Sequence, residues 1–196
     1  GVWLFAWVAR PLGPALAGAG GGGALAAAEA AIAAAQAAFD ATKEKAVAIA
    51  PDQARAVQDA IDGAKASVEK GDYKAAIEAA KAVPAQVKEL ADGLAAKQQE
   101  LEAGWQGLQD VPGMLATFQE KVGAFAKAKR LPAGIDAAKL EAAKQTASEA
   151  VAAWGEAQAA MTAGNWAEAV SIGTRVKTAL TEGMASLGIT QTAAAK

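Results

Sequence analysis

The side chains of this chain that could carry acid–base chemistry are its carboxylates, because histidine and cysteine are both absent from the 196 residues. That absence removes disulfides, thiolate and imidazole metal ligands, and every catalytic arrangement that depends on those side chains. Catalysis by carboxylates needs two of them converging in a pocket with perturbed pKa values, and no spacing in the sequence requires this. We therefore predict that the protein is not an enzyme, and we assign no catalytic, metal-binding or cofactor-binding residue.

Most carboxylates stand close to a lysine along the chain, as Asp40 does with Lys43, Glu78 with Lys81 and Glu89 with Lys88. Opposite charges three or four residues apart on a helix attract each other by about 0.2–0.5 kcal/mol and stay in solvent. These residues predict solvated helix faces. The glycine run Gly20–Gly23 also lacks the following lysine and the preceding strand that a phosphate-binding loop needs.

The charge balance makes nucleic acid an unsuitable partner. Nineteen basic and 21 acidic residues give a formal net charge of −2. Polyanion binding needs a concentrated basic stripe, and the densest basic run, residues 121–130, contains four cations. We expect a protein partner and no nucleic-acid binding.

The elements that carry these groups are helices. Hydrophobic residues make up 53% of the chain, and most are alanine, the residue with the highest helix propensity. An apolar ladder predicts one long helix face packed against other helices, and Pro84 within it predicts a kink or a short break. Its rungs recur every seven residues at Tyr73, Ala80, Val87, Leu94, Leu101 and Leu108, with Ile77, Leu90, Ala91 and Trp105 between them.

Proline, glycine and Asx residues predict where the helices begin and end. Pro51 ends a first helix that starts at Ala24 and begins the second, and Gly71 ends the second. Asp72 is expected to cap the long third helix. Three further helices are predicted. One follows the turn at residues 110–113, one follows Asp136, and one follows the predicted cap Asn165.

The predicted fold class is all-α, an elongated antiparallel bundle of about six helices over residues 24–188. An apolar, glycine-rich arm (1–23) precedes the bundle and a tail (189–196) follows it. Two three-helix halves, 24–109 and 110–188, would share the long third helix. The tryptophans Trp105, Trp154 and Trp166 fall in phase with the apolar faces and predict core positions, with a ligand pocket as the alternative.

Two similar strings suggest related helical hairpins. Residues 71–77 (GDYKAAI) correspond to residues 164–170 (GNWAEAV) at an offset of 93, since 164 minus 71 is 93. Duplication and shared alanine-rich composition both explain this similarity. The strings resemble the turn and second-helix start of tetratricopeptide-type hairpins, which implies the hairpin geometry alone. The first-helix signature of that family is missing, because Ala60, Gly63 and Ala64 occupy its Trp, Leu and Gly positions.

Three interpretations of the N-terminal arm stay open. Its apolar run holds Trp3, Phe5 and Trp7 and is far shorter than the roughly twenty residues of a spanning helix. It could be the remnant of a secretory signal, an aromatic segment (residues 2–9) that docks into a partner or the membrane interface, or an ordinary arm. Residues 16–19 and the following glycines resemble a bacterial lipoprotein signal, with Ala19 in place of the lipidated cysteine, so the lipid acceptor is absent.

These features favour a non-catalytic structural or protein-interaction subunit of a bacterial cell envelope. The alanine-rich helical texture is similar to that of proteins exported to bacterial envelopes, which implies an exported or periplasmic location, with the cytoplasm as the alternative. Two other functions remain open. One is a peripheral subunit of a membrane complex that docks through Trp3, Phe5 and Trp7. The other is a helical carrier of an apolar ligand beside Trp154 and Trp166.

Overall fold

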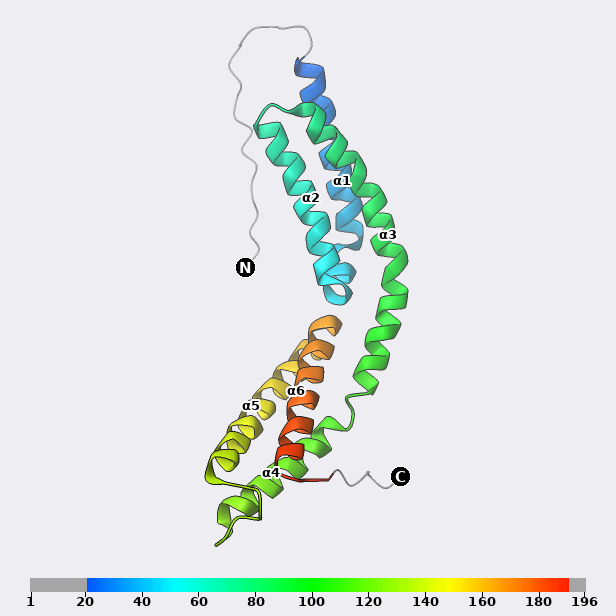
Figure 1. Ribbon diagram of the computed structural model, residues 1–196. Helices are drawn as coiled ribbons and strands as arrows, with labels where there is room; N and C mark the ends of the chain where they lie inside the picture. The colour runs from blue at the N-terminus through cyan, green and yellow to red at the C-terminus, as the bar shows by residue number, and fades with distance from the viewer. Residues whose placement is uncertain (1–20, 191–196) are drawn as a thin grey trace.

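The computed structural model describes residues 21–190, which form six α-helices and no strand. The predicted all-α class is therefore confirmed. The helices make an elongated molecule in which two three-helix groups lie end to end, with the long α3 running down one side (Figure 1). Their bounds are α1 Gly21–Ile49, α2 Pro51–Glu69, α3 Tyr73–Gln106, α4 Val111–Lys127, α5 Ala137–Thr162 and α6 Trp166–Ser186.

The buried apolar residues fall into two clusters, each built from consecutive helices. The first cluster belongs to α1, α2 and α3 (the first half below) and includes Phe39 and Ile61. The second belongs to α4, α5 and α6 (the second half) and includes Phe118 and Leu180. The clusters meet where α6 begins, since Trp166 and Val170 pack against the first one. The two halves are connected along the chain between α3 and α4, and side-chain contacts of α6 join them a second time.

The first helix starts earlier than the sequence predicted. α1 begins at Gly21, so the last three residues assigned to the arm are helical. Glycines weaken a helix, but no proline or capping residue stops this one from extending by a turn. The far end agrees with the prediction, since Ile49 ends α1 and Pro51 opens α2. The arm residues Trp3, Phe5 and Trp7 lie outside the described residues.

α3 passes through Pro84 without a break. Its 34 residues form one helix about 51 Å long at 1.5 Å per residue. Proline removes one backbone hydrogen bond from a helix, and Pro84 itself is exposed to solvent. Figure 1 shows α3 curving as it passes from the first half to the second. Of the two predicted alternatives, a kink or a short break, the break is therefore wrong, and the lost hydrogen bond is accommodated within a continuous, curved helix.

Most of the seven-residue ladder is buried, but its two ends are not as predicted. Tyr73 and Ile77 are half-buried and Ala91 is exposed, whereas Val83, outside the ladder, is fully buried. A helix of 3.6 residues per turn drifts about 20° per heptad against a strict seven-residue repeat, so its buried face moves off the ladder. Leu108 lies beyond the end of α3 and belongs to the second cluster.

The turns that open α3 and α6 have the same backbone geometry. Gly71 has φ +79° and Gly164 φ +83°, the left-handed conformation that glycine adopts without strain. In each turn the next residue donates its N–H to a carbonyl five residues back, Asp72 to Ser67 at 2.9 Å and Asn165 to Ala160 at 2.8 Å. This Schellman arrangement satisfies carbonyls at the ends of α2 and α5.

The two hairpins also bury equivalent positions at the offset of 93. Such agreement extends well beyond the turn itself, so turn chemistry alone does not account for it. The hairpin α2–α3 and the hairpin α5–α6 are therefore two copies of one packing pattern. The pairs buried in both are 54/147, 57/150, 61/154 and 64/157 in the first helices and 76/169, 80/173, 83/176, 87/180 and 94/187 in the second.

Asp72 and Asn165, the residues before α3 and α6, differ in whether their side chains cap the helix, and they provide a matched test. The Asp72 carboxylate accepts from the Ala75 N–H at 3.1 Å, whereas the Asn165 side chain makes no capping hydrogen bond. We expect Asp72→Ala to lower the free energy of unfolding by about 1 kcal/mol because it leaves that N–H without its partner. Asn165→Ala should cost clearly less. Urea denaturation of both variants measures the difference, and equal losses would contradict the cap geometry.

Candidate functional site

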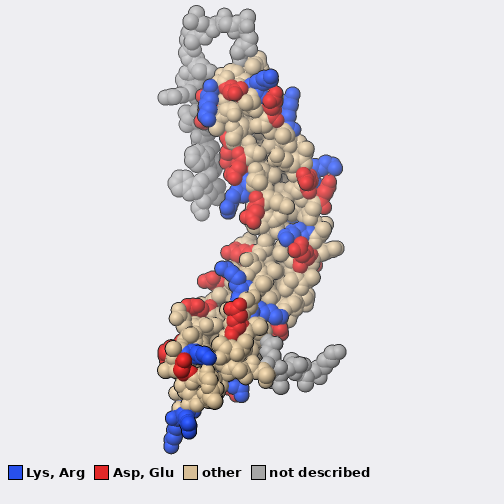
Figure 2. Space-filling model, in the orientation of Figure 1, with Lys and Arg blue, Asp and Glu red and all other residues tan. Residues whose placement is uncertain are grey.

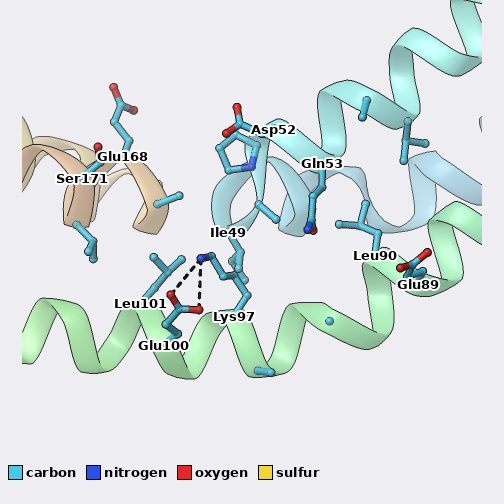
Figure 3. Close-up of a pocket in the computed structure, with 18 of the residues that line it drawn as sticks. Ile49, Asp52, Gln53, Glu89, Leu90, Lys97, Glu100, Leu101, Glu168 and Ser171 are labelled. Atoms are coloured by element: carbon cyan, nitrogen blue, oxygen red, sulfur yellow. Dashed lines mark hydrogen bonds and ion pairs between the residues drawn. The ribbon is translucent and has the colours of Figure 1, made fainter.

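A groove of about 1210 Å³ opens at the junction of the two halves. Figure 3 shows α3 along one side, the corner between α1 and α2 on another, and the start of α6 on a third. The stretch of α3 that lines it runs from Gln86 to Leu101. The groove exists because α2 and α6 both begin at the junction and only α3 continues past it.

Small side chains leave this groove open. Gly93 and Ala96 lie on α3, Ala56 on α2 and Ala167 on α6. A Cβ atom added at Gly93 would meet nothing within 4 Å, so this part of α3 borders open space. Leu90, at 5% exposure, is a buried apolar residue of the lining. The groove therefore has room for large side chains of a bound partner.

The groove is acidic. Its lining includes the carboxylates Asp52, Glu89, Glu100 and Glu168 and one ammonium group, Lys97, so its formal charge is one minus four, or −3. Lys97 is already paired, with its Nζ 3.3 Å from Oε1 of Glu100 (Figure 3). Among residues 21–190, no ion pair involves the other three carboxylates. Figure 2 shows both acidic and basic groups on either side of the junction, so the acidity belongs to the groove lining and not to the surrounding surface.

The lysine expected beside Glu89 pairs elsewhere. Lys88 Nζ lies 3.3 Å from Oδ2 of Asp92, one helical turn away. Adjacent residues on a helix do not face each other, so the predicted pair of Lys88 with Glu89 is wrong. The expected pairs of Asp40 with Lys43 and of Glu78 with Lys81 are also not formed among the described residues. Glu89 is thus left facing the groove without a cation.

A second groove of about 830 Å³ at the junction has a different charge. It lies between the end of α1 and the turn that opens α6, and it includes Trp166. Its lining carries two carboxylates and two ammonium groups, so its formal charge is zero. The acidity is therefore a property of the first groove and not of the junction as a whole. The charged residues of the second groove are Asp40, Lys43, Glu44 and Lys45.

Of the three tryptophans predicted as core residues, Trp154 is buried, whereas Trp105 and Trp166 are half-buried and pack against the two clusters. The rings of Trp105 and Trp154 stack with centroids 5.5 Å apart and planes 5° apart, and Trp154 is 8% exposed. Gly173 makes room for this stack, because a Cβ there would lie 3.3 Å from Cζ3 of Trp154. Trp166 is half-buried against the first cluster. Trp154 is therefore held by neighbouring side chains, and the apolar-carrier function stays a prediction.

The charged groups of the groove are spread over its walls. Within residues 21–190, no group of three or more acidic side chains is placed to hold a metal ion. Asp52, Glu89 and Glu168 come from three different helices and line different parts of the groove. This arrangement can hold several cationic groups at separate points. The docking residues predicted in the arm, Trp3, Phe5 and Trp7, are outside the described residues, and the structure does not bring them to any site.

The comparisons with known proteins supply no relative for the groove. The chain matches no protein-family model, no curated protein and no solved structure.

Proposed function

We propose that the protein is a non-catalytic interaction subunit of a bacterial cell envelope and that it binds another protein at the acidic groove. The observation that carries the proposal is the open groove between two packed three-helix halves. Small-molecule pockets usually enclose about 300–1,000 Å³ and surround most of their ligand. This groove, at about 1210 Å³, is larger and is open to solvent at the junction of the two halves. A macromolecular partner suits it better.

The envelope part of the proposal rests on the sequence. The apolar arm, its Ala15-Leu16-Ala17 pattern and the alanine-rich texture all favour export. One described helix, covering Gly22–Ile49, is long and apolar enough to cross a membrane by length and composition. In the structure one face of this helix packs against α2 and α3 through Ile32, Phe39 and Ile49, and 22% of its most apolar stretch is buried.

A native preparation tests the proposed function. We expect the chain, isolated from the envelope fraction of its source cells, to elute in gel filtration with a second protein at a mass above its own 19.5 kDa. A photo-crosslinking residue at Gly93 should join the two proteins, whereas the same residue at Gly155, on the exposed face of α5, should not. A chain recovered alone as a monomer would remove the basis of the proposal.

A second candidate is a peripheral membrane subunit docked through residues 2–9, which precede the apolar α1 in the sequence. Trp3, Phe5 and Trp7 suit the boundary between lipid and water. Deletion of residues 1–10 should then release the protein from the membrane fraction in a flotation experiment. Unchanged flotation would reject this candidate and leave the groove proposal untouched.

A further inference from the structure

We infer that the partner seated in the acidic groove is a cationic amphipathic α-helix. This inference rests on the proposed function and specifies the chemistry of its partner. Three properties of the groove lead to it, namely the kind of backbone that surrounds it, its dimensions and its charge.

The walls of the groove favour a helix over an extended peptide. All three walls belong to α-helices or to the corner between two of them. Along α3 the backbone groups are engaged within the helix. The first N–H groups of α2 and α6 have no side-chain cap, but isolated N–H groups at a helix start cannot pair with an extended segment as a strand edge does, and the described part of the chain has no strand. A partner must therefore bind through side-chain packing. Helix-in-groove recognition works in this way, with apolar anchors spaced three or four residues apart.

The dimensions suit a helix that crosses α3. The lining stretch Gln86–Leu101 spans 15 residue steps, about 22 Å at 1.5 Å per residue. A helix with its side chains is about 10–12 Å wide, which is less than the length of this stretch, so a helix that crosses α3 fits within it. Gly93 and Ala96 allow the close approach of about 8–10 Å between helix axes. Because these groove residues are small, the partner has to supply the large apolar side chains.

The charge requires those apolar side chains to be flanked by lysine or arginine. Asp52, Glu89 and Glu168 have no cationic partner among the described residues, and they surround the small apolar surface. Asp52 and Glu168 lie in the first turns of their helices, where the helix N-terminus offsets part of their charge. Glu89 lies within α3 and has no such compensation. A helix with a cationic rim complements this pattern, and an acidic helix is repelled.

The direct test measures binding of synthetic peptides to the full chain by fluorescence anisotropy. The probe is a helical peptide of about 15 residues, with leucine along one face and lysine on the other. Two control peptides separate the causes of binding. One has the same composition in scrambled order, so that it keeps the charge and loses the apolar face, and the other has glutamate in place of each lysine. We expect the probe to bind at least about 10-fold more tightly than either control.

Variants of the chain locate the binding. Gly93→Trp fills the groove at a position where the added side chain starts in open space, and we expect it to weaken the probe by at least about 10-fold. Gly155→Trp is the matched control, since Gly155 is also an exposed helical glycine with nothing within 4 Å of an added Cβ, and it should bind normally. Asp52→Asn, Glu89→Gln and Glu168→Gln together should weaken binding and reduce its dependence on salt.

Several results would overturn the inference. They are equal binding by Gly93→Trp, equal binding of the acidic peptide, and binding only after removal of residues 1–20, which would make the arm of this chain the occupant. A dimer that Gly93→Trp dissociates would make a second copy the occupant. If the native preparation contains a partner that crosslinks at Gly93 but the cationic peptide does not bind, the proposed function stands and the inference about partner chemistry fails.

Discussion

Replacement of Phe118 by alanine is expected to lower the free energy of unfolding by about 3–5 kcal/mol, the usual cost of removing a buried aromatic ring. Phe118 is 0% exposed and lies in the centre of the second cluster. Its ring rests against Gly183 of α6, where an added Cβ would lie 2.8 Å from Cζ of the ring. Gly183 has no side chain that could move into the space, so the cavity stays largely unfilled. Urea denaturation followed by circular dichroism measures the loss.

Val151→Ala is the control for that prediction. Val151 lies on α5 in the same half and is 45% exposed, so its truncation should change the free energy of unfolding by less than about 0.5 kcal/mol. A loss at Phe118 no greater than the loss at Val151 would show that the second cluster is not packed as described.

Trp154→Ala is expected to have an effect of similar size, about 3–5 kcal/mol, because it removes a large side chain that is 8% exposed. Part of the loss is the stacking on Trp105, with centroids 5.5 Å apart. Trp105→Ala and the double variant complete a double-mutant cycle, and we expect a coupling energy of about 0.5–1.5 kcal/mol. Strictly additive losses in urea denaturation would contradict the stacked geometry.

Much of the fold was predictable because the residues that decide it act locally. Pro51 fixes the boundary between α1 and α2, and Gly71 with Asp72 fixes the boundary between α2 and α3. Such residues act through their own backbone conformation or through neighbours a few positions away. The exact buried face was harder to predict. Val83 is buried although it lies outside the ladder, and Ala91 is exposed although it was assigned to it. The reason is that an α-helix has 3.6 residues per turn, whereas a seven-residue repeat implies 3.5, so packing decides which residues form the buried face.

The groove could not be predicted because it has no local signature. Asp52, Glu89 and Glu168 are separated by more than 35 residues along the chain, and each alone looks like an ordinary charge on a solvated helix. They meet because α2 and α6 both begin at the junction and α3 runs past both starting points. The repeat at offset 93 contained part of this information, since it indicated that the starts of α3 and α6 are equivalent. It did not indicate where α6 lies relative to α2.

The order of the walls along the chain has a consequence for biosynthesis. The buried residues of the first cluster all precede α4, so they leave the ribosome before α6 covers them with Trp166 and Val170, and small helical units fold in microseconds to milliseconds. At about 5–20 residues per second, translation of α4 to α6 takes on the order of 4–15 s longer. The last wall, at Glu168, arrives only then. A ligand that requires every wall therefore distinguishes finished polypeptides from nascent ones.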